Sequence, residues 1–308
     1  MTRTLVQRVL PAIVSVAILA FLLRGIELAK LADAVTWRVV LIMGGGLLLY
    51  GAATLYLETL SLRRQLEGVS DEVSDWTIAR SKCASYLLGV LHYALGAAAL
   101  SVLLQRRAGI PLARAASVVI LVASVDLVIV LSLAAFGTAW VQTAGAGVHG
   151  GILIAGVAGF FGGLALLRTD RSLGPLDRLR QLTVFEGIRT VPLARLLELL
   201  ALRLAFATCF VSICGAAFVA FHVSAPIVEV VAGVLVVALV AALPIAVAGL
   251  GTSQYAFVEL FQAYADRETL LAMSLVLSAG MLLLRALMGI LFAREFTREA
   301  LRETRVGG

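Results

Sequence analysis

Residues 227–265 have the sequence IVEVVAGVLVVALVAALPIAVAGLGTSQYAFVELFQAYA, and this segment determines the predicted topology. A long apolar limb comes first, and Pro244, Gly249 and Gly251 then interrupt it. A helix is expected to break here, because proline removes a helical hydrogen bond and glycine permits a turn. The second limb, Tyr255–Ala265, is too short to cross a bilayer, since a crossing takes about 20 residues. The stretch therefore predicts a helical hairpin that enters a membrane and returns to the same face.

The whole chain has the composition of a membrane protein. Of its 308 residues, 61% are hydrophobic and 14% are charged, whereas soluble domains average roughly 45–50% and 25%. This composition excludes an ordinary globular domain and a disordered chain, and three cysteines are too few for a disulfide scaffold. The first apolar run is read as a retained helix, because no small-residue cleavage site follows it. Apolar runs occupy 9–23, 39–57, 83–104, 115–136, 148–167, 204–221, 227–249, 255–265 and 272–293.

Basic residues predict the orientation of these runs, because arginine and lysine favour the cytoplasmic side. Six arginines lie in the connection 168–195, which we interpret as a cytoplasmic amphipathic segment, and four lie in the tail after residue 293. The connections 137–147 and 222–226 have neither arginine nor lysine. We therefore expect a multi-pass protein of the cell membrane with both termini in the cytoplasm. This orientation agrees with the number of runs only if 227–265 returns to the outer face.

The run 83–104 raises the same question, because basic residues flank both of its ends. It either turns around Gly89–Gly96, with His92 near the tip, or crosses as one ordinary span. With the hairpin, the order helix, hairpin, helix occurs in 39–136 and again, inverted, in 204–293. The predicted fold is a single integral membrane domain: an all-α polytopic membrane protein with about six full spans plus two re-entrant helical hairpins in an inverted repeat. Many transporters place their site at the midplane of such a repeat.

Ionisable residues inside apolar runs are candidates for function, because a charge at the bilayer centre costs at least about 2.5–3.5 kcal/mol. Asp126 and Arg285 lie in corresponding helices of the two repeats, so we predict that they meet near the midplane as an ion pair. Either Arg285 binds an anionic headgroup, with Asp126 as counter-ion or proton carrier, or the pair only fixes the helix register. His92 contacts the substrate if its hairpin forms, and is a packing residue on a plain helix.

The break in residues 243–254 supplies the other substrate-binding candidates. Helix N-termini attract anions, so the polar side chains that begin the second limb would line a polar tip. The same side chains could also merely cap the limb, and neither role excludes the other. The candidates of this stretch are Pro244, Gly249, Gly251, Thr252, Ser253 and Gln254.

At this stretch the sequence resembles a flippase-like membrane family, the transmembrane region of lysylphosphatidylglycerol synthases and their stand-alone relatives. Members typically carry a proline-rich Gly-Leu-Gly loop and an arginine in the last helix. Here Pro244, Gly249-Leu250-Gly251 and Arg285 match that pattern. The Ala108–Pro111 link and Asp126 resemble an earlier motif of the family.

Three departures from the family pattern put part of its chemistry in doubt. Gln254 stands where an acidic residue is common, and Ala123 stands where an arginine often precedes the aspartate. The proline that is usual in the first hairpin is absent from Gly89–Gly96.

The resemblance implies a transporter or flippase of the bacterial inner membrane that moves lipids or lipid-linked products. The alternative is a membrane scaffold that recruits or presents lipid to a separate biosynthetic enzyme. The aminoacyl-transferase domain of full synthases, a nucleophile and a metal-spaced ligand set are all missing from the sequence, so we expect no enzyme, no cofactor and no metal. The expected partners are membrane lipids with an anionic or amphiphilic head. Nucleic acid is not expected, because no basic domain could lie along a duplex; a biosynthetic partner enzyme and a homo-oligomer stay open.

Overall fold

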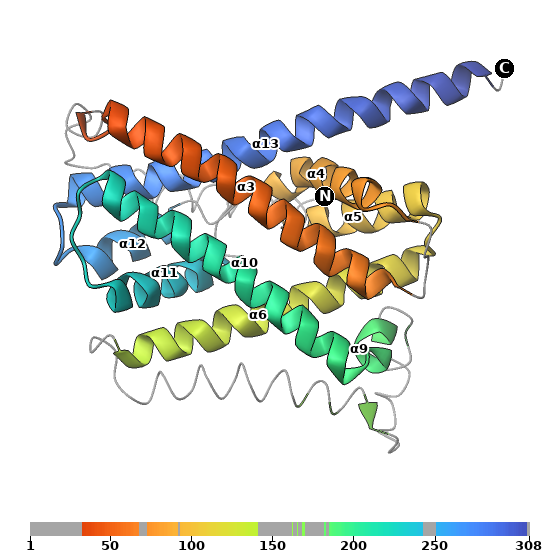
Figure 1. Cartoon of the computed structure of the whole chain (residues 1–308), viewed down its shortest axis with the longest axis horizontal. Coiled ribbons are helices and arrows are strands. Elements are labelled where there is room, and N and C mark those ends of the chain that lie inside the picture. The colour runs from red at the N-terminus through yellow and green to blue at the C-terminus, as the bar shows by residue number, and fades with distance from the viewer. Residues whose placement is uncertain are drawn as a thin grey trace, which may run out of the picture. The chain divides into compact units, whose positions relative to one another are not determined.

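Every regular element in the described part of the chain is a helix (Figure 1). The computed structural model describes residues 33–67, 73–91, 93–140, 162, 165, 168–169, 182, 185–242 and 251–306. The all-α prediction is confirmed for these residues. The helices are α3 (Trp37–Leu66), α4 (Asp75–Leu91), α5 (Tyr93–Ala108), α6 (Leu112–Trp140), α9 (Glu186–Thr190), α10 (Leu193–Ala220), α11 (Ile227–Ala242), α12 (Thr252–Phe261) and α13 (Arg267–Val306).

Four helices, α3, α6, α10 and α13, are long and apolar enough to cross a membrane. They coincide with four of the predicted runs, 39–57, 115–136, 204–221 and 272–293. Only 11% of the apolar window of α13 is buried, and 39% of that of α6. Such exposure of apolar helices is expected where lipid covers them. The runs 9–23 and 148–167 lie outside the described residues, so the number of six full spans stays a prediction.

The run 83–104 belongs to two helices rather than to one straight helix. α4 and α5 have 17 and 16 residues and are separated at position 92. They lie side by side (Figure 1), and a Cβ on Gly96 would lie 2.7 Å from the Cα of Gly89. The pair of glycines therefore allows the two helix backbones to meet, and the predicted break is confirmed. Entry and return at one membrane face stay a prediction.

The second predicted hairpin also consists of two short helices. α11 and α12 have 16 and 10 residues and pack against each other. At their interface, a Cβ on Gly233 would lie 2.4 Å from the ring of Phe261. Phe261 in turn packs against Phe218 and Phe257, with ring centroids 4.9 Å apart in each pair. Aromatic packing thus holds α12 beside α11 and α10.

The described chain divides into two compact units. Unit 1 comprises 1–50, 128–157 and 207–281 and contains α11 and α12. Unit 2 comprises 51–127, 158–206 and 282–308 and contains α4, α5 and α9. Each long helix contributes residues to both units. The order helix, helix pair, helix occurs twice, as predicted, whereas the inverted relation of the two repeats stays a prediction.

The connection 168–195 is described only in part. Arg168 donates to the carbonyl oxygens of Ile188 at 3.2 Å and Val191 at 2.6 Å, which ties it to the short helix α9. Most of the predicted amphipathic segment, which includes 171–181, lies outside the described residues.

Candidate functional site

An arginine is buried inside α10, within unit 2. Arg203 is only 2% exposed, and its Nη1 lies 3.5 Å from Oδ2 of Asp126 on α6. The guanidinium also lies 5.4 Å from the ring centroid of Phe206. Its Nε is buried without a hydrogen-bond partner in the structure. Because an unpaired buried charge is costly, Asp126 is the counter-ion that allows Arg203 to occupy the interior.

A second buried ion pair lies in the same unit. Glu58 of α3 is 8% exposed. Its Oε2 lies 2.7 Å from Nζ of Lys82 and accepts a hydrogen bond of 3.2 Å from the hydroxyl of Tyr86, both on α4. The Lys82 ammonium also lies 5.5 Å from the ring centroid of Tyr86. The lysine is therefore held between a carboxylate and an aromatic face.

These groups form one polar cluster together with Arg285 of α13. We define the polar cluster as Glu58, Lys82, Asp126, Arg203 and Arg285. Lys82 interacts electrostatically with Arg203, Asp126 and Arg285. Arg285 lies on an exposed face of α13 and forms no ion pair with a described residue. With every group in its ordinary ionised form, the cluster holds three cations and two carboxylates, which gives a formal charge of 3 − 2 = +1.

The prediction that Asp126 forms an ion pair with Arg285 is wrong. Asp126 pairs with Arg203, although Asp126 and Arg285 both interact with Lys82 and so belong to one cluster. The reason is the length of α10, which begins at Leu193, so that Arg203 lies inside the helix and reaches Asp126.

The predicted polar tip of α12 lies in unit 1 and is engaged in local contacts. Gly251, with φ of 92°, precedes the helix, and this left-handed conformation favours glycine. Gln254 is fully buried. Its Oε1 accepts hydrogen bonds from Gly251 N at 2.6 Å and from Ser253 Oγ at 3.2 Å, and its Nε2 donates to Ser278 Oγ at 2.9 Å. Gln254 therefore caps α12, which is the alternative expected for this stretch, and Thr252 is the first residue of the helix.

The remaining predicted site residues, His92, Pro244 and Gly249, lie outside the described residues. Among the residues that are described, no group of three or more His, Cys, Asp and Glu could hold a metal ion. The expectations that no metal and no cofactor bind stay predictions.

Residues 8–289 match the family model of the lysylphosphatidylglycerol synthase TM region. The chain belongs to this family. The resemblance noted in the sequence is thereby confirmed, and membership together with the four long apolar helices makes the chain a multi-pass membrane protein. Membership in the lysylphosphatidylglycerol synthase TM family links the chain to lipid biosynthesis or transport. Neither a curated protein nor a solved structure matches the chain.

Three members of the polar cluster are not predicted from the sequence: Glu58, Lys82 and Arg203. Each directly adjoins an apolar run, where a charged residue is expected to flank a span rather than to lie inside it. The structure extends the helices beyond the runs, so that all three lie inside helices. Leucines spaced through 193–204 are the signal that could have extended α10 back past Arg203.

Proposed function

We propose that this protein moves an anionic lipid, or a lipid-linked product with an anionic head, between the two leaflets of a cell membrane. The polar cluster would hold the head while the apolar helices face the acyl chains. The observation that carries the proposal is the excess positive charge of this cluster among helices that are long and apolar enough to span. In this proposal the lipid is moved without any chemical change.

Arg285 is the cluster member that needs a ligand most. Each carboxylate of the cluster already has a basic partner, Lys82 for Glu58 and Arg203 for Asp126. Arg285 has no such partner among the described residues. A cation within a membrane-spanning helix is costly, by about 2.5–3.5 kcal/mol or more near the centre. An anionic headgroup would neutralise it, and phosphate or carboxylate oxygens suit the donors of a guanidinium.

The two broken helix pairs support a transporter rather than a plain bundle. Interrupted helices leave backbone groups without helical partners, and such groups are tolerated at membrane depth only where protein or a water-filled cavity surrounds them. Transporters use interrupted helices in repeated halves to build a midplane site. The order of α3, α4–α5, α6 and of α10, α11–α12, α13 fits that plan. In our proposal the pairs enter from opposite faces of a bacterial inner membrane, and both termini are cytoplasmic.

Lipid exchange in reconstituted vesicles tests the proposal. The full chain is placed in vesicles with fluorescent phosphatidylglycerol, and a membrane-impermeant quencher reports the fraction that has reached the outer leaflet. We expect the protein to accelerate lipid exchange. The exchange rate should be lower by roughly tenfold or more in the Arg285→Gln variant, because one charge-assisted contact is removed. Arg267→Gln is the matched control, since Arg267 is the exposed first residue of the same helix. Equal exchange rates with and without protein, for anionic and zwitterionic lipids alike, would refute transport. The alternative function, a membrane scaffold that presents lipid to a separate enzyme, would then remain.

A further inference from the structure

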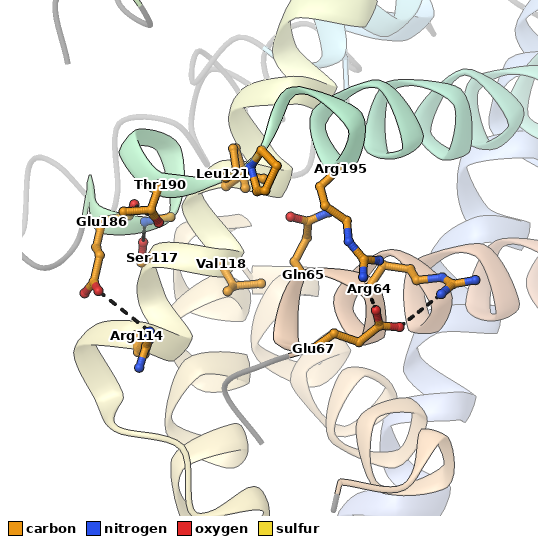
Figure 2. Close-up of a pocket in the computed structure, with 13 residues that line it drawn as sticks. Arg64, Gln65, Glu67, Arg114, Ser117, Val118, Leu121, Glu186, Thr190 and Arg195 are labelled. Carbon is orange, nitrogen blue, oxygen red and sulfur yellow. Dashed lines mark hydrogen bonds and ion pairs between the residues drawn. The ribbon is translucent and has the colours of Figure 1, made fainter. Parts of the chain in front are cut away.

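A separate polar pocket lies in unit 2, where the end of α3, the start of α6, α9 and the start of α10 meet (Figure 2). Its volume is about 250 Å³. Sites for drug-sized ligands usually measure about 300–1,000 Å³, so this pocket suits a smaller group. Three arginines and two glutamates line it: Arg64, Arg114, Arg195, Glu67 and Glu186.

Both glutamates of the pocket lie beside arginines. Glu67 accepts a hydrogen bond from Arg195 and lies 3.1 Å from Nη1 of Arg64. The hydrogen bond from Arg195 lowers the pKa of Glu67, so this group is a carboxylate at neutral pH. Glu186 faces Arg114 at 3.8 Å, which is longer than a hydrogen bond and leaves the donors of Arg114 available. The acidic groups therefore do not make the pocket a cation site.

The unused hydrogen-bonding capacity of the pocket consists of donors. The side-chain Nε2 of Gln65 is buried without a hydrogen-bond partner. The oxygen of Ser117 accepts from the backbone N–H of Gly187 at 2.5 Å, so its hydroxyl proton remains to be donated. In the view of Figure 2, Arg114 and Ser117 lie on one side and Gln65 and Arg195 on the other, with Val118 between them. Buried donors normally have an acceptor, and the donors of this pocket come from two helices, Gln65 from α3 and Arg114 and Ser117 from α6.

We propose that this pocket binds a phosphate group, with Arg114, Ser117 and Gln65 as its donors. Phosphate offers several acceptor oxygens in different directions, which suits donors on separate helices, and arginine binds it in a bidentate manner. The group belongs either to a phospholipid head or to free phosphate. The site is distinct from the polar cluster, because Arg195 and Arg203 are eight residues apart on α10, or about 12 Å along its axis.

Thermal unfolding of the full chain in phosphate-free detergent tests the proposal, since a ligand that binds the folded state raises the unfolding midpoint. Inorganic phosphate is one probe, added at constant ionic strength. Short-chain phosphatidylglycerol is the other, compared with a diacylglycerol of the same chain length. We expect a saturable rise for at least one phosphate probe and affinity roughly tenfold weaker in Arg114→Gln and Ser117→Ala.

The variants are chosen so that a loss of ligand affinity can be distinguished from misfolding. The Arg114 side chain is 47% exposed, so its replacement by glutamine should preserve the fold. Arg106→Gln is the matched control, because Arg106 is exposed on α5 and does not line the pocket. The unfolding midpoint without ligand is compared for all variants, and unchanged midpoints assign a loss of affinity to the site itself.

Both sources of phosphate have their own outcome. A response to inorganic phosphate assigns a free-phosphate site, and a response to phosphatidylglycerol alone assigns a lipid-head site; either supports the proposal if Arg114→Gln weakens it. No response to either probe, or equal affinity in the variant and in wild type, overturns it. The Arg285→Gln variant should keep its phosphate affinity, because that residue belongs to the polar cluster. Failure of this site and failure of lipid transport are therefore distinguishable.

Discussion

Replacing Asp126 by asparagine removes the counter-ion of a buried arginine at nearly constant side-chain size. The two charges lie 3.5 Å apart, which corresponds to about 5 kcal/mol of Coulomb attraction at an effective dielectric constant of about 20. Removing one partner of a fully buried pair costs about 3–5 kcal/mol. Because the Asp126 side chain is 32% exposed, we expect a smaller loss of unfolding free energy in Asp126→Asn, about 2–3 kcal/mol.

A double-mutant cycle measures the pair itself. Unfolding of wild type, Asp126→Asn, Arg203→Met and the double variant is followed in the same detergent. We expect the double variant to be less destabilised than the sum of the single variants, by about 1–3 kcal/mol. Strict additivity of the two substitutions would show that Asp126 does not stabilise Arg203.

The same substitution gives an opposite expectation for ligand binding. Asp126→Asn raises the formal charge of the polar cluster to 3 − 1 = +2. Phosphatidylglycerol should then raise the unfolding midpoint of the variant more than that of wild type, because the anionic head replaces the missing carboxylate. A smaller rise than in wild type would contradict the role of Asp126 as a resting counter-ion.

Three further substitutions test single contacts. The hydrogen bond from Arg195 lowers the pKa of Glu67 below its ordinary value of 4.5, so its stabilisation is present above that value and lost as the pH falls through the folded pKa. The stability difference between wild type and Glu67→Gln, followed by thermal unfolding, should therefore shrink as the pH falls below 4.5; a constant difference would contradict it. Gln254→Leu, which removes the cap of α12, should cost about 1–3 kcal/mol of unfolding free energy in a denaturant titration. Gly96→Ala places a Cβ 2.7 Å from the backbone of α4 and should cost about 1–3 kcal/mol. Gly44→Ala, with nothing within 4 Å of its Cβ, is the control and should be neutral or slightly stabilising.

The sequence was sufficient for the features that depend on local chemistry. Apolar runs predicted the four long helices, because a run of about 20 apolar residues is the main requirement for a span. Glycines predicted where the first helix pair is interrupted, because α4 ends and α5 begins on either side of position 92; Pro244 lies outside the described residues. The polar start of α12 left two alternatives, and Gln254 turned out to be the cap.

Which charges pair could not be predicted, because pairing depends on where helices begin and on which faces meet. Apolar runs end at charged residues by definition, so Lys82 and Arg203 lie just outside the runs 83–104 and 204–221. In the structure both residues lie inside the helices that contain those runs. α10 begins eleven residues before the run 204–221. At about 1.5 Å per residue this adds roughly 16 Å of helix, and it places Arg203 inside the bundle of unit 2.

The exposure of two arginines on α10 separates the two sites that this helix serves. The side chain of Arg195 is 34% exposed, and surface pairs such as its contact with Glu67 contribute little to stability, because water screens them. Arg203 is 2% exposed, and Asp126 and the ring of Phe206 offset the cost of removing its charge from water. Apolar residues in place of such a buried pair are often as stable or more so. Stability alone therefore does not require Arg203 and Asp126, whereas a protein that must bind an anionic head among apolar helices requires a cation there.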